Sequence, residues 1–242
     1  VEQADAMRRD FVANVSHEIR TPLTVVAGFL ETIQTLPLHD AERSRYLDLM
    51  AAQTRRMQML VTDLLTLSGL EGKPPASRTE TLGGEELMRQ LQAEAGALSA
   101  ARGASAEPQH VFSFEGGPGL EILCEPGELI SAASNLLSNA VRYTPPGGRI
   151  DVRLLPQADG RLRFGVRDNG PGIAPEHIPR LTERFYRVDR SRSRDTGGTG
   201  LGLAIVKHVV QRHGADLLID SKPGQGSEFC MMLPEARWRR LT

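Results

Sequence analysis

The sequence predicts an α+β protein in which a helical hairpin precedes an α/β sandwich with one mostly antiparallel sheet. Residues 3–70 show the heptad rhythm of two long packed helices. After residue 79, strand-like and helix-like runs are mixed without the strict alternation of βαβ units, which favours a sheet covered by a helical layer. Residues 69–77, with two glycines and two prolines, indicate a linker between the two parts.

Length and charge limit the classes of function. The 242 residues give room for one large or two small domains, and the net charge of −1 provides no basic field for nucleic acid. Cys124 and Cys230 lack CxxC spacing, so we expect a reducing compartment without disulfides. No apolar run approaches the roughly 20 residues that span a bilayer. Because Val1 already lies in a helical pattern, we expect a fragment of a longer protein, which a membrane segment could precede.

The first two helices carry apolar seams on heptad spacing. The seam of the second helix consists of Tyr46, Met50, Gln53, Met57, Leu60, Leu64 and Leu67. The seam of the first helix consists of Val12, Ile19, Leu23, Val26, Leu30 and Ile33, with Ser16 at one place. Residues 36–40 interrupt the pattern, and Asp40 is the expected N-cap of the second helix. Two antiparallel helices cannot bury two-sided stripes alone, so we expect a symmetric dimer forming a four-helix bundle.

His17 stands beside Glu18 on the first helix, about one turn before Pro22. Proline lacks an N–H and crowds the carbonyl four residues back, so the helix is disturbed beside the histidine. His17 lies two residues from Ile19, roughly 200° around the helix, and therefore faces solvent rather than the seam. A neutral imidazole nitrogen can act as a nucleophile while a neighbouring carboxylate holds the other proton. An isolated His-Glu pair is nevertheless most often an ordinary surface pair.

The second region contains further helices and several short strands. Helical patterns cover residues 85–101, 126–142 and 202–213, and strand patterns cover residues 110–114, 120–124, 149–155, 161–168, 216–221 and 227–233.

A polar cluster follows one edge of the helix predicted at 126–142. Asn135, Asn139, Arg142 and Tyr143 follow at spacings of four, three and one, so they share an edge. An amide oxygen can ligate Mg²⁺, and an arginine can bind phosphate oxygens. The same pattern also fits the partly exposed end of an ordinary amphipathic helix.

Three further segments suit a nucleotide. Asp168 ends a strand and can reach the amino group of a base while Gly170 and Gly172 keep the backbone close, although Asp-Asn-Gly is also a common turn. Residues 197–204 place four glycines directly before a helix, which favours an anion site, although they also fit a flexible lid. Residues 183–194 join an aromatic pair to a cationic loop that suits a polyphosphate lid or a solvated charge run.

In this order, these segments resemble the transmitter region of two-component sensor histidine kinases. Residues 16–22 are similar to the phosphoacceptor box, 135–143 to the N box, 168–173 to the first glycine box, 183–189 to the F box and 198–202 to the second glycine box. The resemblance covers nearly the whole chain. Residues 11–17 and 181–194 are most similar to the phosphate-regulon branch of the family.

The resemblance implies a dimeric four-helix bundle joined to an ATP-binding sandwich of the GHKL (Bergerat) type. It implies that His17 accepts the γ-phosphoryl group of ATP and that Glu18 assists as a base. The phosphoryl group then passes to an aspartate on the receiver domain of a response regulator. Thr21 would position water for the reverse reaction, the dephosphorylation of that regulator.

The resemblance also implies roles in the nucleotide site. Asn139 would hold Mg²⁺ with Asn135 nearby, and Asp168 would bind the adenine amino group. Arg187 would act at the phosphates as a catalytic residue. The expected nucleotide-binding set is Asn135, Asn139, Arg142, Tyr143, Asp168, Gly170, Gly172, Ile173, Phe185, Gly198, Thr199, Gly200, Leu201 and Gly202.

Two departures and three alternatives accompany this interpretation. Thr182 stands where an apolar aromatic often begins the F box, and Arg142 replaces the commoner lysine with a planar fork. Related ATPases and chaperones resemble one another in placing a glutamate base where this chain has Asn135, which disfavours hydrolysis as the main reaction. A zinc peptidase would need a second histidine at Thr21. A dimeric scaffold without catalysis is left for an assay to decide.

We expect a dimerisation and phosphotransfer domain at residues 1–70, a linker at 71–78, an ATP-binding domain at 79–236 and a tail at 237–242. The expected partners are a second copy and a response regulator, with no direct contact to nucleic acid. We expect the chain on the cytoplasmic side of a bacterial inner membrane, reached only through a region preceding this sequence. The signal and the choice between phosphorylation in cis and in trans stay open.

Overall fold

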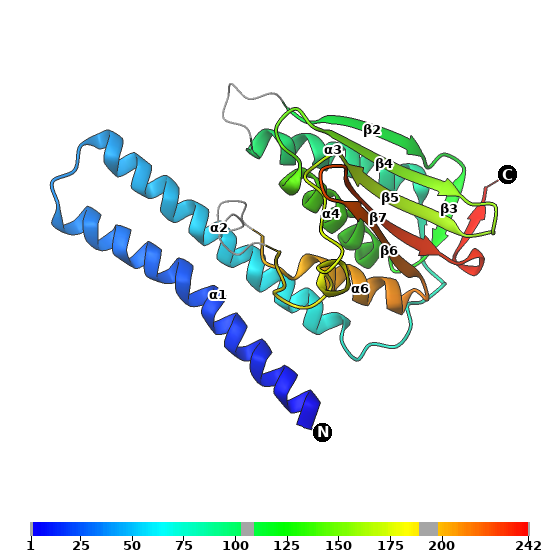
Figure 1. Ribbon diagram of the computed structural model, residues 1–242, viewed down its shortest axis with the longest axis horizontal. Helices are drawn as coiled ribbons and strands as arrows, with labels where there is room; N and C mark the ends of the chain where they lie inside the picture. Colours follow the sequence, from blue (N-terminus) through cyan, green and yellow to red (C-terminus); the bar gives the residue numbers. More distant parts are fainter. Residues whose placement is uncertain (1, 103–108, 189–197, 242) are drawn as a thin grey trace.

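The structure is a computed structural model that describes residues 2–102, 109–188 and 198–241, the side chains of residues 2–10, 101 and 102 excepted. A long helical hairpin extends from one side of an α/β sandwich, and its second helix packs against the sandwich (Figure 1). The α+β architecture predicted from the sequence is confirmed. Within the described segments, no helix has the length and apolar character needed to cross a membrane.

The hairpin consists of α1 (Glu2–Thr35) and α2 (Asp40–Leu70), which run antiparallel (Figure 1). α1 continues through Pro22 without an interruption in its helical assignment. Near the connecting turn, the rings of Phe29 and Tyr46 stack with their centroids 5.1 Å apart. This aromatic pair joins the two helices at the end of the hairpin far from the sandwich.

The N-cap of α2 is His39, one residue before the predicted Asp40. The backbone N–H of His39 donates to the carboxylate of Glu42 at 3.2 Å. Glu42, in the first turn of the helix, therefore makes the hydrogen bond of a capping box that runs from the N3 side chain to the N-cap backbone. Asp40 is already the first residue of the helix.

The heptad seam is buried unevenly along the hairpin. Leu60, Leu67 and Leu70 of α2 are buried and belong to the hydrophobic core that continues into the sandwich. In contrast, Leu23 and Leu30 of α1 are exposed. The sandwich thus covers the C-terminal half of α2, whereas much of the α1 seam has no cover within one chain.

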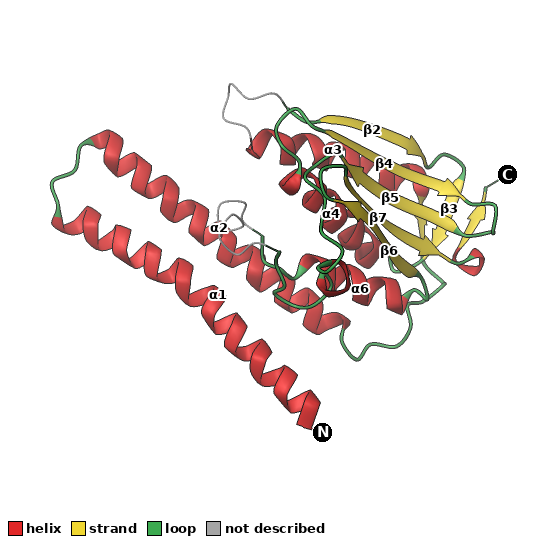
Figure 2. Cartoon of the chain, in the orientation of Figure 1, coloured by secondary structure: helices red, strands yellow, loops and turns green. Residues whose placement is uncertain are grey.

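A five-stranded sheet forms one layer of the sandwich. Its strands, in spatial order, are β2 (Val111–Gly116), β4 (Arg149–Pro156), β5 (Leu162–Asp168), β7 (Gly226–Leu233) and β6 (Asp216–Lys222). Only the β2–β4 pair is parallel among these described strands, as a mostly antiparallel sheet requires. The helices on one face of the sheet are α3 (Gly84–Arg102), α4 (Pro126–Tyr143) and α6 (Gly202–Arg212), as Figure 2 shows.

The helical layer buries its apolar faces against the sheet. Leu136 and Leu137 of α4 and Val206 of α6 are buried, together with Phe164 and Val166 of β5. Because the apolar side chains of α4 take one face of that helix, its polar edge is left at the border of the layer. This packing fixes the position of the predicted nucleotide cluster.

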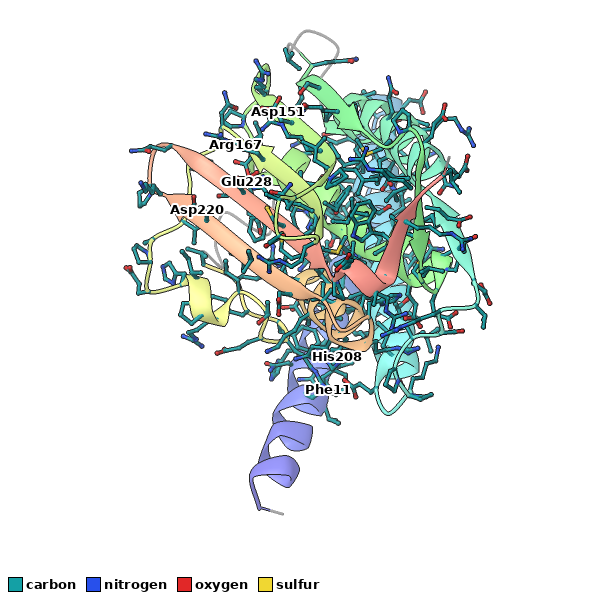
Figure 3. The ribbon with its side chains drawn as sticks, turned by 90° about the vertical axis from the view of Figure 1, so that its right-hand side faces the viewer. Phe11, Asp151, Arg167, His208, Asp220 and Glu228 are labelled. Atoms are coloured by element: carbon teal, nitrogen blue, oxygen red, sulfur yellow. The ribbon has the colours of Figure 1, made fainter. Side chains whose placement is uncertain are left out.

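The other face of the five-stranded sheet carries charged side chains. The strand register places Asp151, Arg167, Glu228 and Asp220 beside one another on four neighbouring strands. Figure 3 shows this row on the side of the sheet opposite the helical layer. Charged side chains on one face and apolar ones on the other explain the alternation along these strands.

A second, smaller sheet corrects two expectations. Its strands are β1 (Thr81–Gly83), β3 (Leu120–Leu123) and β8 (Trp238–Arg240), in the order β1-β3-β8. The prediction of one sheet was therefore wrong, and so was the prediction of a tail at 237–242, because β8 pairs with β3. Strands of three residues are too short for an alternating pattern to show in the sequence. Short 3₁₀ turns lie at Ile178–Arg180 and Glu235–Arg237.

The last part of the predicted linker packs as part of the sandwich. The backbone N–H of Ala76 donates to the carbonyl of Arg212 at 2.8 Å. The buried Arg237 guanidinium donates to the carbonyls of Ala76, Ser77 and His213 at 2.9, 2.8 and 3.0 Å. Because guanidinium has five donors in a fixed fork, one side chain can hold three carbonyls. Ala76 and Ser77, within the predicted linker, are thus already hydrogen-bonded to the sandwich.

Candidate active site

The polar edge of α4 gathers the four predicted residues. Asn135 donates from Nδ2 to the carbonyl of Ser131 at 2.9 Å, which orients its amide. Oδ1 of Asn139 lies 3.5 Å from Nη1 of Arg142. Tyr143 ends the helix and is 48% exposed. The sequence prediction that these side chains share one edge is therefore consistent with the structure.

Arg142 carries positive charge into a partly buried position. Burial lowers the pKa of the Arg142 guanidinium, while Tyr143 and Asp63 oppose that shift. A Cβ placed on Gly198 would lie only 2.9 Å from Nη1 of Arg142, so a glycine lets the loop approach the cation. Arg142 also lies in the last turn of α4, where the helix dipole favours a cation. The site thus holds a cation where a phosphate could reach it.

A buried histidine holds the end of α4. Nε2 of His110 lies 3.1 Å from the carbonyl of Thr144, and Nδ1 lies 2.9 Å from Oγ of Ser99. A carbonyl only accepts, so Nε2 donates to it. This connection fixes the residue that follows Tyr143. Sequence reasoning missed His110 and Ser99, because no local pattern shows that they meet.

Asp168 lies at the end of β5 and is buried. Its Oδ1 accepts the backbone N–H of Gly170 at 2.8 Å. Burial raises the pKa of the Asp168 carboxyl, and hydrogen bonds from the N–H groups of Gly170 and Ser227 oppose that rise. Gly172 has φ +69°, and a Cβ there would lie 2.0 Å from the carbonyl oxygen of Lys222. Only glycine fits this turn beside the carboxylate.

Two serines support the glycine turn from β6 and β7. Oγ of Ser221 accepts the backbone N–H of Ile173 at 2.8 Å. The hydroxyls of Ser221 and Ser227 lie 2.9 Å apart, and both residues are buried. Both serines lie on strands that are remote from Ile173 in the sequence, so no local pattern predicts that they support this turn.

The second glycine loop, residues 198–202, lies between α4 and α6. Thr199 accepts the backbone N–H of Leu201 on its Oγ1 at 3.2 Å, which shapes the loop before α6. A Cβ on Gly202 would lie 2.5 Å from Oδ1 of Asn135, so the loop touches the polar edge of α4 directly. The helix N-terminus adds positive potential and N–H donors to this place.

The aromatic pair of the predicted F box docks beside the same loop. The backbone N–H of Phe185 donates to the carbonyl of Gly200 at 2.9 Å, and Phe185 has φ +62°. The hydroxyl of Tyr186 lies 2.7 Å from Nδ1 of His177, and the Arg180 guanidinium stacks 4.3 Å above the Tyr186 ring. The predicted cationic positions 190, 192 and 194, and position 197, lie outside the described residues.

Arg187 connects the nucleotide cluster to the hairpin through its electrostatic neighbours. Burial lowers the pKa of Arg187, Tyr143 and Glu18 oppose this shift, and Arg56 and Arg142 add to it. Charged groups of α1, α2 and α4 thus contribute to the electrostatic environment of Arg187. Arg187 lies 169 positions after Glu18 in the sequence, so no local pattern could show that their charges influence each other.

His17 is exposed on α1, as its position outside the seam predicts. The carboxylate of Glu18 pairs with Nη2 of Arg56 on α2 at 2.9 Å. Oγ1 of Thr21 donates to the carbonyl of His17 at 3.2 Å. Sequence reasoning missed Arg56, which lies beside a seam position and has no motif of its own. It restrains the carboxylate next to the exposed imidazole.

Further contacts join the hairpin to the sandwich. The rings of Phe11 and Phe185 have centroids 5.9 Å apart. Arg184 pairs with Glu71, and Nε2 of His208 lies 3.9 Å from the same carboxylate. Figure 3 labels Phe11 of α1 and His208 of α6, both below the sheet in that view. These contacts place the F box against the hairpin.

The chain therefore contains two sites with polar side chains. One is an exposed histidine beside a restrained carboxylate on a helical hairpin. The other is a glycine-lined anion site with a buried aspartate in a sandwich. This combination of an exposed histidine and a glycine-lined loop beside a helix N-terminus is typical of phosphotransfer proteins.

The match to known families agrees with this class. Residues 7–73 match HisKA, the His Kinase A (phospho-acceptor) domain. Residues 124–237 match HATPase_c, described as histidine kinase-, DNA gyrase B-, and HSP90-like ATPase. The chain belongs to the sensor histidine kinases of two-component systems.

Curated relatives share this organisation over nearly the whole chain. The phosphate regulon sensor protein PhoR of Pseudomonas aeruginosa is 47% identical over 236 residues, which cover 97% of this chain and 52% of that protein. PhoR of Haemophilus influenzae is 35% identical over 94% of this chain and 52% of its own length. The sensor histidine kinase WalK of Bacillus subtilis is 35% identical over 96% of this chain and 38% of its own length. The chain thus spans about half or less of these relatives.

Solved structures show the same fold. Full-length ShkA in complex with AMPPNP has a TM-score of 0.64 and 29% identity, covering 93% of this chain and 45% of that chain. ThkA in complex with the response regulator protein TrrA has a TM-score of 0.71 and covers 97% of this chain and 64% of that chain. Its identity of 19% makes it evidence for the fold alone.

Proposed function

We propose that this chain is the transmitter region of a sensor kinase that transfers the γ-phosphoryl group of ATP to His17. The observation that carries the proposal is the packing of α1 against the F box: the rings of Phe11 and Phe185 have centroids 5.9 Å apart, and the backbone N–H of Phe185 donates to the carbonyl of Gly200 in the second glycine loop at 2.9 Å. Contact between the helix that carries His17 and the proposed phosphate loop suits a phosphoryl group that moves from one to the other. Phosphoryl transfer depends mainly on such positioning and neutralisation of charge.

The residues present fit ATP. The loop at 198–202 approaches Arg142 and Asn135 so closely that side chains would fill the space, and it leads into the N-terminus of α6. Buried Asp168 offers a carboxylate acceptor for the amino group of adenine, beside the turn that only Gly172 allows. AMPPNP in the complex with ShkA, a relative in structure, supports a nucleotide of this class.

Magnesium fits the same edge of α4. The amide oxygens of Asn139 and Asn135 are neutral donors of the type that Mg²⁺ accepts. Across the described side chains, no group of three or more His, Cys, Asp or Glu forms a metal site of its own. The ion would therefore share these amides with phosphate oxygens. When bound, it neutralises negative charge on the transferring group.

The chemistry at His17 follows from its neighbours. One imidazole nitrogen forms a bond to the γ-phosphorus as the bond to the bridging oxygen breaks, and ADP leaves with that electron pair. Glu18 receives the proton from the other ring nitrogen, so the phosphorylated ring ends neutral. Arg56 holds the Glu18 carboxylate at 2.9 Å, which orients the base for that role.

A second copy and a response regulator complete the proposed reaction. The exposed seam of α1, with Leu23 and Leu30, suits a partner hairpin in a four-helix bundle. The phosphoryl group on His17 would pass to an aspartate of a receiver domain. The fold neighbour ThkA was solved with the response regulator TrrA, which supports a partner of this kind.

The relatives named PhoR support a finer assignment to signalling in phosphate starvation. We assign the reverse reaction, dephosphorylation of the regulator, to Thr21, one turn after His17. In this structure the Thr21 hydroxyl donates to the carbonyl of His17, so it must turn to bind water. The proposed location is the cytoplasmic side of a bacterial inner membrane.

Labelling with γ-³²P-ATP tests this proposal. We expect label that is lost in acid and stable in alkali, as a phosphoramidate requires. His17→Gln should abolish the label completely, because glutamine has no nucleophilic ring nitrogen. His39→Gln changes another exposed histidine of the hairpin, and this variant should still become labelled. Label retained by the His17 variant would contradict the proposal.

A further inference from the structure

Asp63 of α2 contacts the second glycine loop of the sandwich. Oγ1 of Thr199 donates to Oδ2 of Asp63 at 2.6 Å. The same oxygen of Thr199 accepts the backbone N–H of Leu201, so the loop is bonded both to itself and to the hairpin. Thr199 is only 9% exposed and Asp63 is partly buried, so this hydrogen bond is partly shielded from water. Asp63 lies outside the set of residues proposed to bind ATP or to accept the phosphoryl group.

The Asp63 carboxylate shares its partners with the proposed nucleotide. Burial raises the pKa of Asp63, and the hydrogen bond from Thr199 and the charge of Arg142 oppose that rise. A partly buried carboxylate needs such compensation. Here both compensating residues belong to the set that would bind phosphate. An anionic group of α2 is thus placed at the anion site of the sandwich.

Two anions cannot use these partners fully at the same time. A threonine hydroxyl has one proton to donate, and in this structure Asp63 accepts it. A phosphate oxygen that accepts the same proton must displace the carboxylate. If the carboxylate stayed nearby, the two negative charges would repel each other in this partly buried site.

We propose that Asp63 and the phosphates of ATP compete for Thr199, so that ATP binding releases the second glycine loop from α2. This inference rests on the proposed function only in taking ATP as the ligand of the loop. Asp63 is then a positioning residue, because it acts on the nucleotide through Thr199. By thermodynamic linkage, a change that weakens the contact between Asp63 and Thr199 tightens the binding of ATP.

The other polar contacts between hairpin and sandwich are less shielded. Side chains of Arg184 and Glu71 are 37% and 40% exposed, and exposed ion pairs contribute little. His208 lies 3.9 Å from Glu71 and is partly exposed as well. The hydrogen bond between Asp63 and Thr199 differs from these ion pairs, because a phosphate oxygen that binds the Thr199 hydroxyl must break it.

A double-mutant cycle tests the competition. The probe is AMPPNP with Mg²⁺, titrated calorimetrically into the whole chain. Asp63→Ala should tighten binding by roughly tenfold, because the phosphate no longer displaces a carboxylate. In a Thr199→Val background, which lacks the contested hydroxyl, the same change should give a clearly smaller gain, because only the charge repulsion is relieved. Asp63→Asn keeps an oxygen acceptor without the charge and should give an intermediate gain.

Asp48→Ala provides the matched control, since Asp48 lies exposed on the same helix. It should leave the affinity for AMPPNP unchanged. Equal or weaker binding by the Asp63 variants, or equal gains in both Thr199 backgrounds, would overturn the competition. Asp63→Asn serves if the alanine variant does not fold. Binding of AMPPNP without label on His17 would refute the proposed kinase reaction and leave this inference standing. A chain that binds no AMPPNP would refute the proposed competition between Asp63 and ATP.

Discussion

The hairpin and the sandwich satisfy their apolar residues in different ways. In the sandwich, Ile150 and Leu154 are completely buried by other parts of the same chain. In the hairpin, Leu23 and Leu30 of the α1 seam are 55% and 45% exposed. Exposed apolar residues in a row indicate an interface. The nucleotide site is therefore built within one chain, whereas the helix that presents His17 depends on a second surface for its packing.

A pair of glycine substitutions gives the largest expected contrast between these regions. In the sandwich, Gly172→Ala would place Cβ 2.0 Å from the carbonyl oxygen of Lys222 at φ +69°. We expect the free energy of unfolding of the sandwich to fall by about 3 kcal/mol or more, since backbone strain adds to the overlap. Nucleotide binding should be lost with it. Urea denaturation followed by circular dichroism measures the first effect.

Gly28→Ala is the matched control in the hairpin. Gly28 lies in α1, and a Cβ there would have nothing within 4 Å. Alanine should stabilise the helix by roughly 0.5–1 kcal/mol, because glycine loses more backbone entropy on folding. Similar losses at both positions would show that the two regions are not packed as differently as the structure indicates.

A charge in the α1 seam tests the other side of the comparison. Leu23→Asp would put a carboxylate into the proposed bundle interface twice, once from each copy. We expect the dissociation constant of the dimer to rise at least about a hundredfold, since apolar burial is lost and a charge is desolvated. Sedimentation equilibrium measures this change. Affinity for AMPPNP should stay the same, because the sandwich is complete in one chain.

Leu218→Asp controls for exposed leucines in general. Leu218 is 50% exposed on β6, at the charged face of the sheet rather than in the hairpin. Its replacement should leave the dimer intact. A dimer that survives Leu23→Asp would place the second copy elsewhere on the molecule.

The elements that sequence patterns predicted are those with long local periodicity. The two hairpin helices show it in the heptad seam, and α4 shows it in the spacing from Asn135 to Tyr143. Strands β1 and β8, of three residues each, have too few positions to alternate. They form only because β3 lies between them, which is a contact made across the chain.

The site was predictable to the same extent. Asp168 and Gly172 belong to one local turn, so their spacing in the sequence was enough to predict a carboxylate beside a tight glycine turn. Asp63, Arg56 and Ser221 act through partners that are distant in the sequence, and each lies in an ordinary helix or strand. No period or motif specifies which remote side chain they will meet. Tertiary packing decides these positions.

The smallest expected effect concerns a buried histidine of the sandwich, His213. Its Nε2 accepts the backbone N–H of Glu125 at 3.2 Å, and Nδ1 lies 2.8 Å from the carbonyl of Val209. Both nitrogens are thus used by the neutral ring. Burial lowers the pKa of His213, the carbonyl of Val209 and the charge of Glu128 oppose this, and Arg237 adds to it.

This lowered pKa predicts how stability depends on pH. Below about pH 6.5 the unfolded chain binds a proton at this histidine, and the folded chain does not until lower pH. The free energy of unfolding should therefore fall on acidification, by up to about 1.4 kcal/mol per pH unit from this group. His213→Gln should flatten that slope in urea titrations between pH 7.5 and 5.5. His39→Gln, at an exposed position in the turn of the hairpin, is the matched control and should leave the slope as it is. Equal slopes for the wild type and the His213 variant would assign the acid sensitivity to other groups. The contrast between a buried histidine in the sandwich and an exposed one in the hairpin would then have no effect on stability.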